Sequence, residues 1–156
     1  MRKQFFRTLL ELAQKDKNII FLTGDLGFGF MEDYQKRFPN QFINCGCIEQ
    51  GMLGIAAGLA MSGKKPYVYS TIPFVLMRAY EQIRNDICYQ NNNVKLIGVS
   101  QSGFLGWSHN LQGLENEEDL LKNLPNIKTY YPATTIELEE IMKLENKRTG
   151  PCYIRL

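Results

Sequence analysis

The sequence predicts an α/β protein with three α/β/α layers, in which helices cover both faces of a mainly parallel six-stranded sheet. Short apolar runs typical of buried strands alternate with longer segments of helical periodicity along the whole chain. Strands that alternate with crossover helices pair in parallel. The length of 156 residues is that of one domain, and no repeat or linker interrupts the pattern. We therefore expect a single domain over residues 1–156.

The alternation begins with a helix. Residues 2–15 place apolar side chains such as Phe5 and Leu9 at helical spacing. The run NIIFLTG, residues 18–24, is apolar and ends in glycine, which predicts a buried strand. A short helix is expected over residues 30–38, because the proline that follows cannot continue it.

The central part of the chain repeats this order twice. FINC at residues 42–45 and YVYST at residues 67–71 predict strands. Between them, residues 49–62 predict a helix that ends at a glycine. Residues 74–89 predict a long amphipathic helix.

The last part contains three more strands and two helices. The strands are predicted at residues 94–100 (VKLIGVS), 127–131 (IKTYY) and 152–156 (CYIRL). One helix is expected over residues 115–123, before a proline. The other begins at Thr134, whose hydroxyl forms a capping box with Glu137 three residues later.

Composition argues against several functional classes. The formal net charge is +2, and Lys and Arg are scattered among Asp and Glu, which argues against a nucleic-acid surface. No apolar run reaches the roughly 20 residues of a membrane span, and the first residues lack the apolar core of a signal peptide. We expect a cytoplasmic protein that binds neither nucleic acid nor membrane.

The four cysteines are expected to be reduced thiols that pack in strands as small hydrophobic side chains. Cys45 and Cys47 are separated by one residue, which is too close for a normal disulfide or a CxxC pair. The lone histidine, His109, has no ligand neighbour in the sequence. We therefore expect no metal site in this chain.

Ligands of open α/β sheets bind beyond the carboxyl ends of the strands. This rule selects four loops, at residues 24–29, 46–49, 70–74 and 100–114. The first reads GDLGFG, but it lacks the GK[ST] of a P-loop and fits G-x-G-x-x-G poorly. Its glycines allow a tight turn, and Asp25 either caps backbone amides or points into a site.

Three glycines lie inside the helix predicted at residues 49–62. Gly51, Gly54 and Gly58 each cost about 1 kcal/mol relative to alanine in a helix interior. The helix is apolar nearly all round, which predicts burial from every side. Either it packs tightly on its own sheet or, as we favour, a second subunit approaches the face shared by Gly54 and Gly58.

Glu49 is the single charged residue of this helix, and it stands in the first turn. It either compensates the helix dipole, worth about 0.3–1 kcal/mol, or acts as a functional acid in an apolar setting, where desolvation favours the protonated form. The pattern alone leaves both open. His109, in GFLGWSHNLQ after a predicted strand, is likewise either structural or functional.

The stretch NCGCIEQGMLGIAAGLAMSGKKPYVYST, residues 44–71, resembles the signature of the pyrimidine-binding domain of transketolase-like, thiamine-diphosphate-dependent enzymes. Further similarities follow in the same order: MRAYEQIRNDI, VKLIGVSQSG, the SH of GWSHN, ENEEDLL, LPNIKTYYPAT and GPCYIRL. The resemblance covers essentially the whole chain. It is specific for the family and weak for the substrate.

The resemblance implies a role for each candidate residue. In the family, a glutamate hydrogen-bonds N1′ of the aminopyrimidine and so promotes proton removal from the reactive carbon of the thiazolium. Such a glutamate must share a proton near neutral pH, which requires the buried apolar site that Glu49 would have. His109 would contact substrate or intermediate oxygens, and Asp25 would lie near the thiazolium. Arg78 matches a family arginine in the helix after the third predicted strand, and the resemblance places it among the cofactor-binding residues without a defined role.

The loop after the third predicted strand departs from the family pattern. In transketolases an aromatic side chain of this loop stacks on the pyrimidine. The alignment places Ile72 and Val75 there, with Phe74 beside them. Either Phe74 shifts to stack on the pyrimidine, or aliphatic contacts replace the stacking.

A second departure concerns the diphosphate. The family holds Mg²⁺ and diphosphate through a GDG motif and a downstream asparagine, whereas this chain reads Gly24-Asp25-Leu26. Magnesium prefers oxygen ligands together with phosphate. The resemblance therefore implies that the diphosphate and Mg²⁺ are held by a partner subunit, in a hetero-oligomer such as α₂β₂. The chain would be a split-gene subunit or an excised domain.

The resemblance implies the pyrimidine-binding subunit of a thiamine-diphosphate-dependent, transketolase-like transferase that is active only with its partner. It would transfer a two-carbon ketol unit between phosphosugars or related carbonyl compounds. A condensation like that of 1-deoxyxylulose-phosphate synthase or of the oxo-acid dehydrogenase E1 β chain is the alternative within this class. A non-catalytic dimerisation or regulatory module is the alternative outside it.

Overall fold

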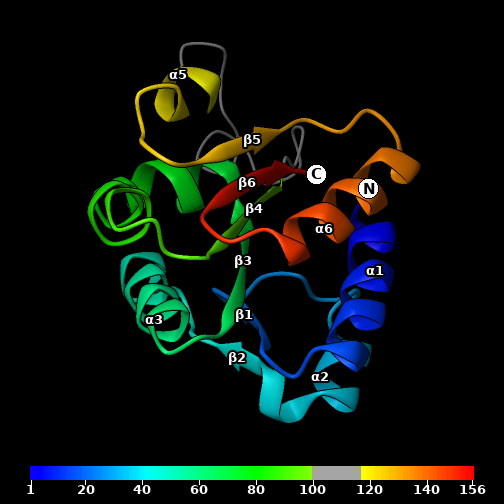
Figure 1. Cartoon of the computed structure of the whole chain (residues 1–156). Helices are drawn as coiled ribbons and strands as arrows, with labels where there is room; N and C mark the ends of the chain where they lie inside the picture. The colour runs from blue at the N-terminus through cyan, green and yellow to red at the C-terminus, as the bar shows by residue number, and fades with distance from the viewer. Residues whose placement is uncertain (100–116) are drawn as a thin grey trace.

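The computed structural model describes residues 1–99 and 117–156, and its elements form three layers (Figure 1). A six-stranded sheet lies in the middle, with the strand order β2-β1-β3-β4-β6-β5. All five neighbouring pairs are parallel, which confirms the predicted fold class. The strands are β1 (Ile19–Thr23), β2 (Phe42–Asn44), β3 (Lys65–Thr71), β4 (Lys95–Val99), β5 (Lys128–Tyr130) and β6 (Cys152–Arg155).

Helices cover both faces of this sheet (Figure 1). One face carries α1 (Arg2–Lys15), α2 (Glu32–Arg37) and α6 (Thr135–Lys147). The other face carries α3 (Glu49–Met61), η2 (Phe74–Arg78), α4 (Tyr80–Gln82), η3 (Ile83–Tyr89) and α5 (Glu117–Leu121). A short 3₁₀ turn, η1 (Pro39–Gln41), leads into β2.

Each face of the sheet has its own apolar core, because successive residues of a strand point to opposite faces. Phe21 of β1 packs among the rings of Phe5 and Phe6 from α1. The next residue, Leu22, belongs to the other core, together with Met52 and Leu53 of α3. The fully buried strands β1 and β4 therefore read as nearly continuous apolar runs rather than as alternating ones.

The segment predicted as one long helix at residues 74–89 is helical but irregular. Its two ends, η2 and η3, are wide π-helical turns, and only the residues of α4 between them form an α-helical turn. Ala79 leaves helical geometry at φ −117° and ψ 26°, which separates η2 from α4. Such wide turns occur frequently at functional sites.

Two smaller expectations need correction or lie partly outside the described residues. Of the four cysteines, all unpaired, only Cys152 lies in a strand, whereas Cys88 lies in η3 and Cys45 and Cys47 lie in the loop before α3. The helix expected at residues 115–123 is described only from Glu117 onward, where α5 begins. Among the helices of the described ranges, none combines the length and the apolar character needed to cross a membrane.

A buried ionic cluster fixes the amino end of β4 to α6. Lys95 Nζ lies 3.3 Å from Glu145 Oε2, and both side chains are fully buried. Lys95 also donates to the carbonyl of Gly150 at 2.9 Å. Burial raises the pKa of Glu145, but hydrogen bonds from Arg148 and Tyr130 outweigh it and lower that pKa to about 2. At the start of α6, Thr134 accepts from the backbone N–H of Glu137 as predicted, whereas the Glu137 carboxylate accepts from the N–H of Ala133 instead of that of Thr134.

Candidate active site

The candidate site lies where β1, β2 and β3 end. The register pairs Thr23 of β1 with Asn44 of β2 and with Tyr69 of β3, so the segments that follow these strands start from one edge of the sheet. Glu49 begins α3 shortly after β2 and is only 2% exposed. A side-chain Cβ at Gly24 would lie 3.3 Å from the Gly46 carbonyl oxygen and 3.6 Å from Glu49 Oε1. Glycine at position 24 therefore lets the end of β1 approach the buried carboxylate closely.

Arg78 is the ion-pair partner of Glu49 among the described residues. Its Nη1 donates to Glu49 Oε2 at 2.7 Å. The guanidinium carbon also lies over the ring of Phe74, 3.8 Å from the ring centroid. The Arg78 side chain is 46% exposed, whereas that of Glu49 is 1% exposed. A buried carboxylate is therefore paired with a cation that reaches solvent, and a half-buried aromatic ring lies beneath that cation.

The aliphatic neighbours of Phe74 are part of the core. Ile72 is 5% exposed and Val75 is fully buried, and both pack with α3 and the central strands. Two buried hydroxyls at the end of β3, Ser70 Oγ and Thr71 Oγ1, have no hydrogen-bond partner within the described part of the chain. The end of β3 thus combines apolar side chains with two buried hydroxyls.

Asp25 lies at the surface, next to the Asn44 side chain. It is exposed, with a left-handed backbone at φ 59°, a conformation that few residues other than glycine adopt. Its N–H donates to Asn44 Oδ1 at 3.0 Å, and Asn44 Nδ2 donates to the Asp25 carboxylate at 3.3 Å. Among the described residues the carboxylate therefore accepts from a side-chain amide rather than from backbone amides, and its direction toward a site stays a prediction. Sequence reasoning missed Asn44, although its position at the end of a predicted strand was an available signal.

The prediction that α3 is buried from every side is wrong for the chain by itself. Met52, Leu53 and Ala56 are fully buried, but the opposite side of the helix is open. A Cβ at Gly54 or at Gly58 would meet no atom within 4 Å. The large apolar side chains exposed on or beside this helix are Ile48, Ile55 and Met61. We call the exposed surface formed by Ile48, Gly51, Gly54, Ile55, Gly58 and Met61 the glycine face of α3.

Two further expectations concern histidine and metal. His109 lies outside the described residues. Within residues 1–99 and 117–156, no three His, Cys, Asp or Glu side chains gather as a metal site would require.

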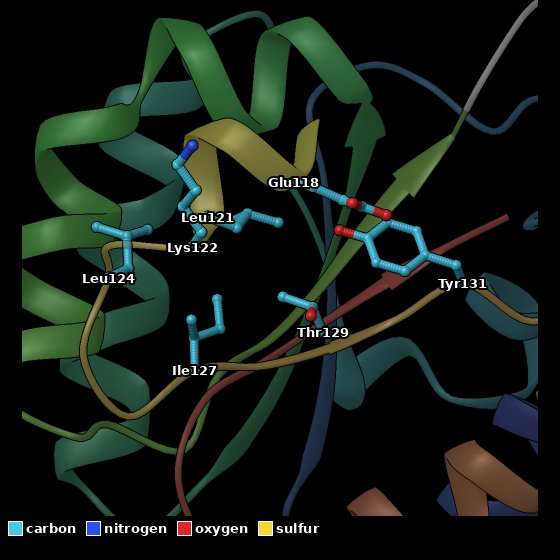
Figure 2. Close-up of a pocket in the computed structure, with 7 residues that line it drawn as sticks. All are labelled: Glu118, Leu121, Lys122, Leu124, Ile127, Thr129 and Tyr131. Carbon is cyan, nitrogen blue, oxygen red and sulfur yellow. The ribbon is translucent and has the colours of Figure 1, made fainter. Parts of the chain in front are cut away.

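A cavity lies away from this edge, beside β5 at the opposite edge of the sheet from β2. Figure 2 shows Leu121, Leu124 and Ile127 around it, with Tyr131 at its rim. Its volume is about 520 Å³. Two strands, β4 and β6, separate β5 from β3, so this cavity is not part of the Glu49 site.

Comparison with known proteins gives consistent results. The family model described as "Transketolase, pyrimidine binding domain" matches residues 1–156. One of the subunits of apulose-4-phosphate transketolase from Phocaeicola vulgatus is 38% identical over 99% of this chain and 50% of that protein. A 1-deoxy-D-xylulose-5-phosphate synthase from Bacillus cereus is 39% identical over 95% of this chain and 24% of that protein.

A solved structure described as "Split gene transketolase, inactive beta4 tetramer" has a TM-score of 0.87 and 36% identity. The match covers 99% of this chain and 50% of that one. This chain therefore spans half or less of the length of these relatives.

Proposed function

Because the chain belongs to the transketolase pyrimidine-binding domain family, we propose that it is the pyrimidine-binding subunit of a thiamine-diphosphate-dependent, transketolase-like transferase. The proposed reaction transfers a two-carbon ketol unit between phosphosugars or related carbonyl compounds, and it belongs to carbohydrate metabolism. The proposal treats residues 1–156 as one domain and places the protein in the cytoplasm, where its four unpaired cysteines would stay reduced.

The observation that carries the proposal is the buried carboxylate of Glu49 in the first turn of α3. Thiamine diphosphate, when bound, supplies a nucleophilic carbon at C2 of its thiazolium ring. Glu49 would hold the proton that it shares with N1′ of the aminopyrimidine. A carboxyl group can share a proton in this way only where water does not compete for it, and a side chain exposed by 1% meets that condition.

The surrounding residues fit a flat heterocycle. Phe74 is half-buried, whereas Ile72 and Val75 are committed to the core, so their burial supports stacking by Phe74 over aliphatic contacts. We propose that Asp25, whose carboxylate is exposed, lies toward the thiazolium. We propose in addition that His109 contacts substrate oxygens.

The diphosphate and Mg²⁺ would be bound by a partner subunit. Two relatives support this arrangement, since one is named as a transketolase subunit and another is described as a split gene transketolase. The glycine face of α3 is the proposed contact surface, because an uncharged helix face with exposed Ile55 and Met61 is typical of surfaces that another subunit covers. An α₂β₂ assembly would bury one such face in each copy of this chain.

The test is the Glu49→Gln variant in the complex with the diphosphate-binding subunit. Glutamine keeps the shape of glutamate but does not exchange the proton, so we expect turnover to fall by about 100-fold or more while the complex still forms. Glu81→Gln, an exposed glutamate on α4, is the matched control and should leave turnover unchanged. Normal turnover of Glu49→Gln would falsify the proposal.

A second candidate reaction is a condensation of the 1-deoxyxylulose-5-phosphate synthase type, which the 39% identity to the Bacillus cereus enzyme favours. Substrate profiling of the complex separates it from ketol transfer. A non-catalytic module remains the alternative outside the enzyme class. Calorimetric titration of thiamine diphosphate into the complex distinguishes the two, because a module that lost catalysis would give no heat of binding.

A further inference from the structure

The contacts of Arg78 resemble those that a pyrimidine ring would make at this site. Its guanidinium is flat, carries delocalised positive charge and presents N–H donors in its plane. One of these donors binds Glu49 Oε2 at 2.7 Å. The group also lies over the Phe74 ring, with 3.8 Å between Cζ and the ring centroid. A protonated aminopyrimidine is likewise flat and cationic, and it would need the same carboxylate oxygen and the same ring face.

We propose that Arg78 occupies the pyrimidine subsite while the cofactor is absent, and that the pyrimidine must displace it to reach Glu49 and Phe74. This inference rests on the proposed function. It assigns Phe74 as the stacking ring, and it makes Arg78 a competitor of the cofactor. Arg78 would thereby protect a buried carboxylate from being left unpaired in the free subunit.

The structure makes this displacement feasible. Glu49 lies on α3, which packs on the central strands, so its carboxylate should not move when Arg78 is displaced. Arg78 ends the wide turn η2, and the next residue, Ala79, leaves helical geometry. The Arg78 side chain is already 46% exposed and can move into water without a large desolvation change. Because one member of the ion pair is half-exposed, competition by Arg78 should weaken pyrimidine binding by about fivefold or less.

The test uses a small probe and the isolated chain, so that neither turnover nor the partner subunit enters. 4-Amino-2-methylpyrimidine is titrated into the chain, and NMR chemical shifts report binding. Arg78→Met keeps a long side chain but cannot pair with Glu49 or compete for it. We expect this variant to bind the probe about fivefold more tightly than the native chain. Arg84→Met, an exposed arginine in η3, is the matched control and should bind as the native chain does.

Two further measurements test the mimicry directly. In the Arg78→Met chain, guanidinium chloride below denaturing concentrations should weaken probe binding, while sodium chloride at matched ionic strength should not. Adding Phe74→Leu to Arg78→Met should weaken probe binding by about fivefold, because the stacking surface is lost.

The outcomes separate this inference from the proposed function. If Arg78→Met binds the probe as tightly as the native chain or more weakly, the proposal that Arg78 competes with the pyrimidine is refuted. A failure of guanidinium to weaken probe binding would refute it as well. If the probe still needs Glu49 in that case, shown by loss of binding in Glu49→Gln, the proposed function stands. Absence of probe binding to every variant would overturn both.

Discussion

Replacing Gly54 and Gly58 by alanine should make the isolated chain more stable and its assembly weaker. Both residues lie inside α3, and neither has a positive φ. An added Cβ would meet no atom of the chain within 4 Å at either position. Alanine is favoured over glycine in a helix interior by about 1 kcal/mol, so the double variant should gain about 2 kcal/mol. For a chain of this length, that corresponds to a rise in Tm of about 4–8 °C.

The effect on assembly has the opposite sign. If another subunit packs closely on the glycine face of α3, two added methyl groups will overpack the contact. Overpacking costs about 1–3 kcal/mol, which weakens association by about 5- to 150-fold. Thermal denaturation at a concentration where the chain is monomeric measures the first effect. Sedimentation of the chain alone, and with the proposed diphosphate-binding subunit, measures the second.

The two measurements can refute the reasoning separately. A loss of stability in the isolated chain would mean that the glycines pack within the chain after all. A gain of stability with unchanged association would remove the glycine face as a subunit contact. Glu140→Ala, an exposed position of α6 on the opposite face of the sheet, is the control and should not change association.

The remaining predictions concern the stability of the chain. The ionised carboxylate of Glu145 should add about 3 kcal/mol to the free energy of unfolding above pH 4.5, because folding lowers its pKa from 4.5 to about 2. This contribution should be lost as the pH falls toward 2, and urea denaturation across this pH range measures it. Glu145→Gln should remove that pH dependence and cost about 3–5 kcal/mol at neutral pH, since it leaves Lys95 buried without its counter-charge. Gly98→Ala should lower the free energy of unfolding, measured by thermal denaturation, by about 2 kcal/mol or more. The added Cβ would lie 2.7 Å from Cε2 of the buried Tyr153 ring. Thr134→Ala should cost about 1 kcal/mol in the same denaturation assay, through loss of the helix cap.

The fold was predictable because its strands are buried on both faces. Runs such as residues 19–23 and 95–99 are apolar without interruption or nearly so, and such runs alternate with helices in the same way along the chain. The strand order β2-β1-β3-β4-β6-β5 was not predicted, since it depends on which edge each crossover joins. The irregularity of residues 74–89 was also missed, because a π-helical turn carries nearly the same apolar pattern as an α-helical one.

The candidate site was predictable in its parts but not in its contacts. Glu49 drew attention as the one charge in an apolar helix, and the structure buries it. Its pairing with Arg78 joins residues 29 positions apart and follows from the packing of η2 against α3, which no local pattern encodes. The stacking of Arg78 on Phe74 was easier to predict from the sequence, since the two residues are four positions apart on one helical segment.

The local costs in α3 and the proposed role of Glu49 have a common explanation. A helix that contains three glycines and begins with a buried carboxylate is a poor choice for stability in isolation. Natural sequences break local rules of this kind mainly where function requires it. Here the open glycines leave room for a second backbone, while the carboxylate at the same helix's first turn is shielded from water. A subunit that packs on the open glycines would therefore offset the helix cost on one side of α3, while the buried side of the same helix holds Glu49. Stability and activity of the assembly should then respond to the same substitutions on α3.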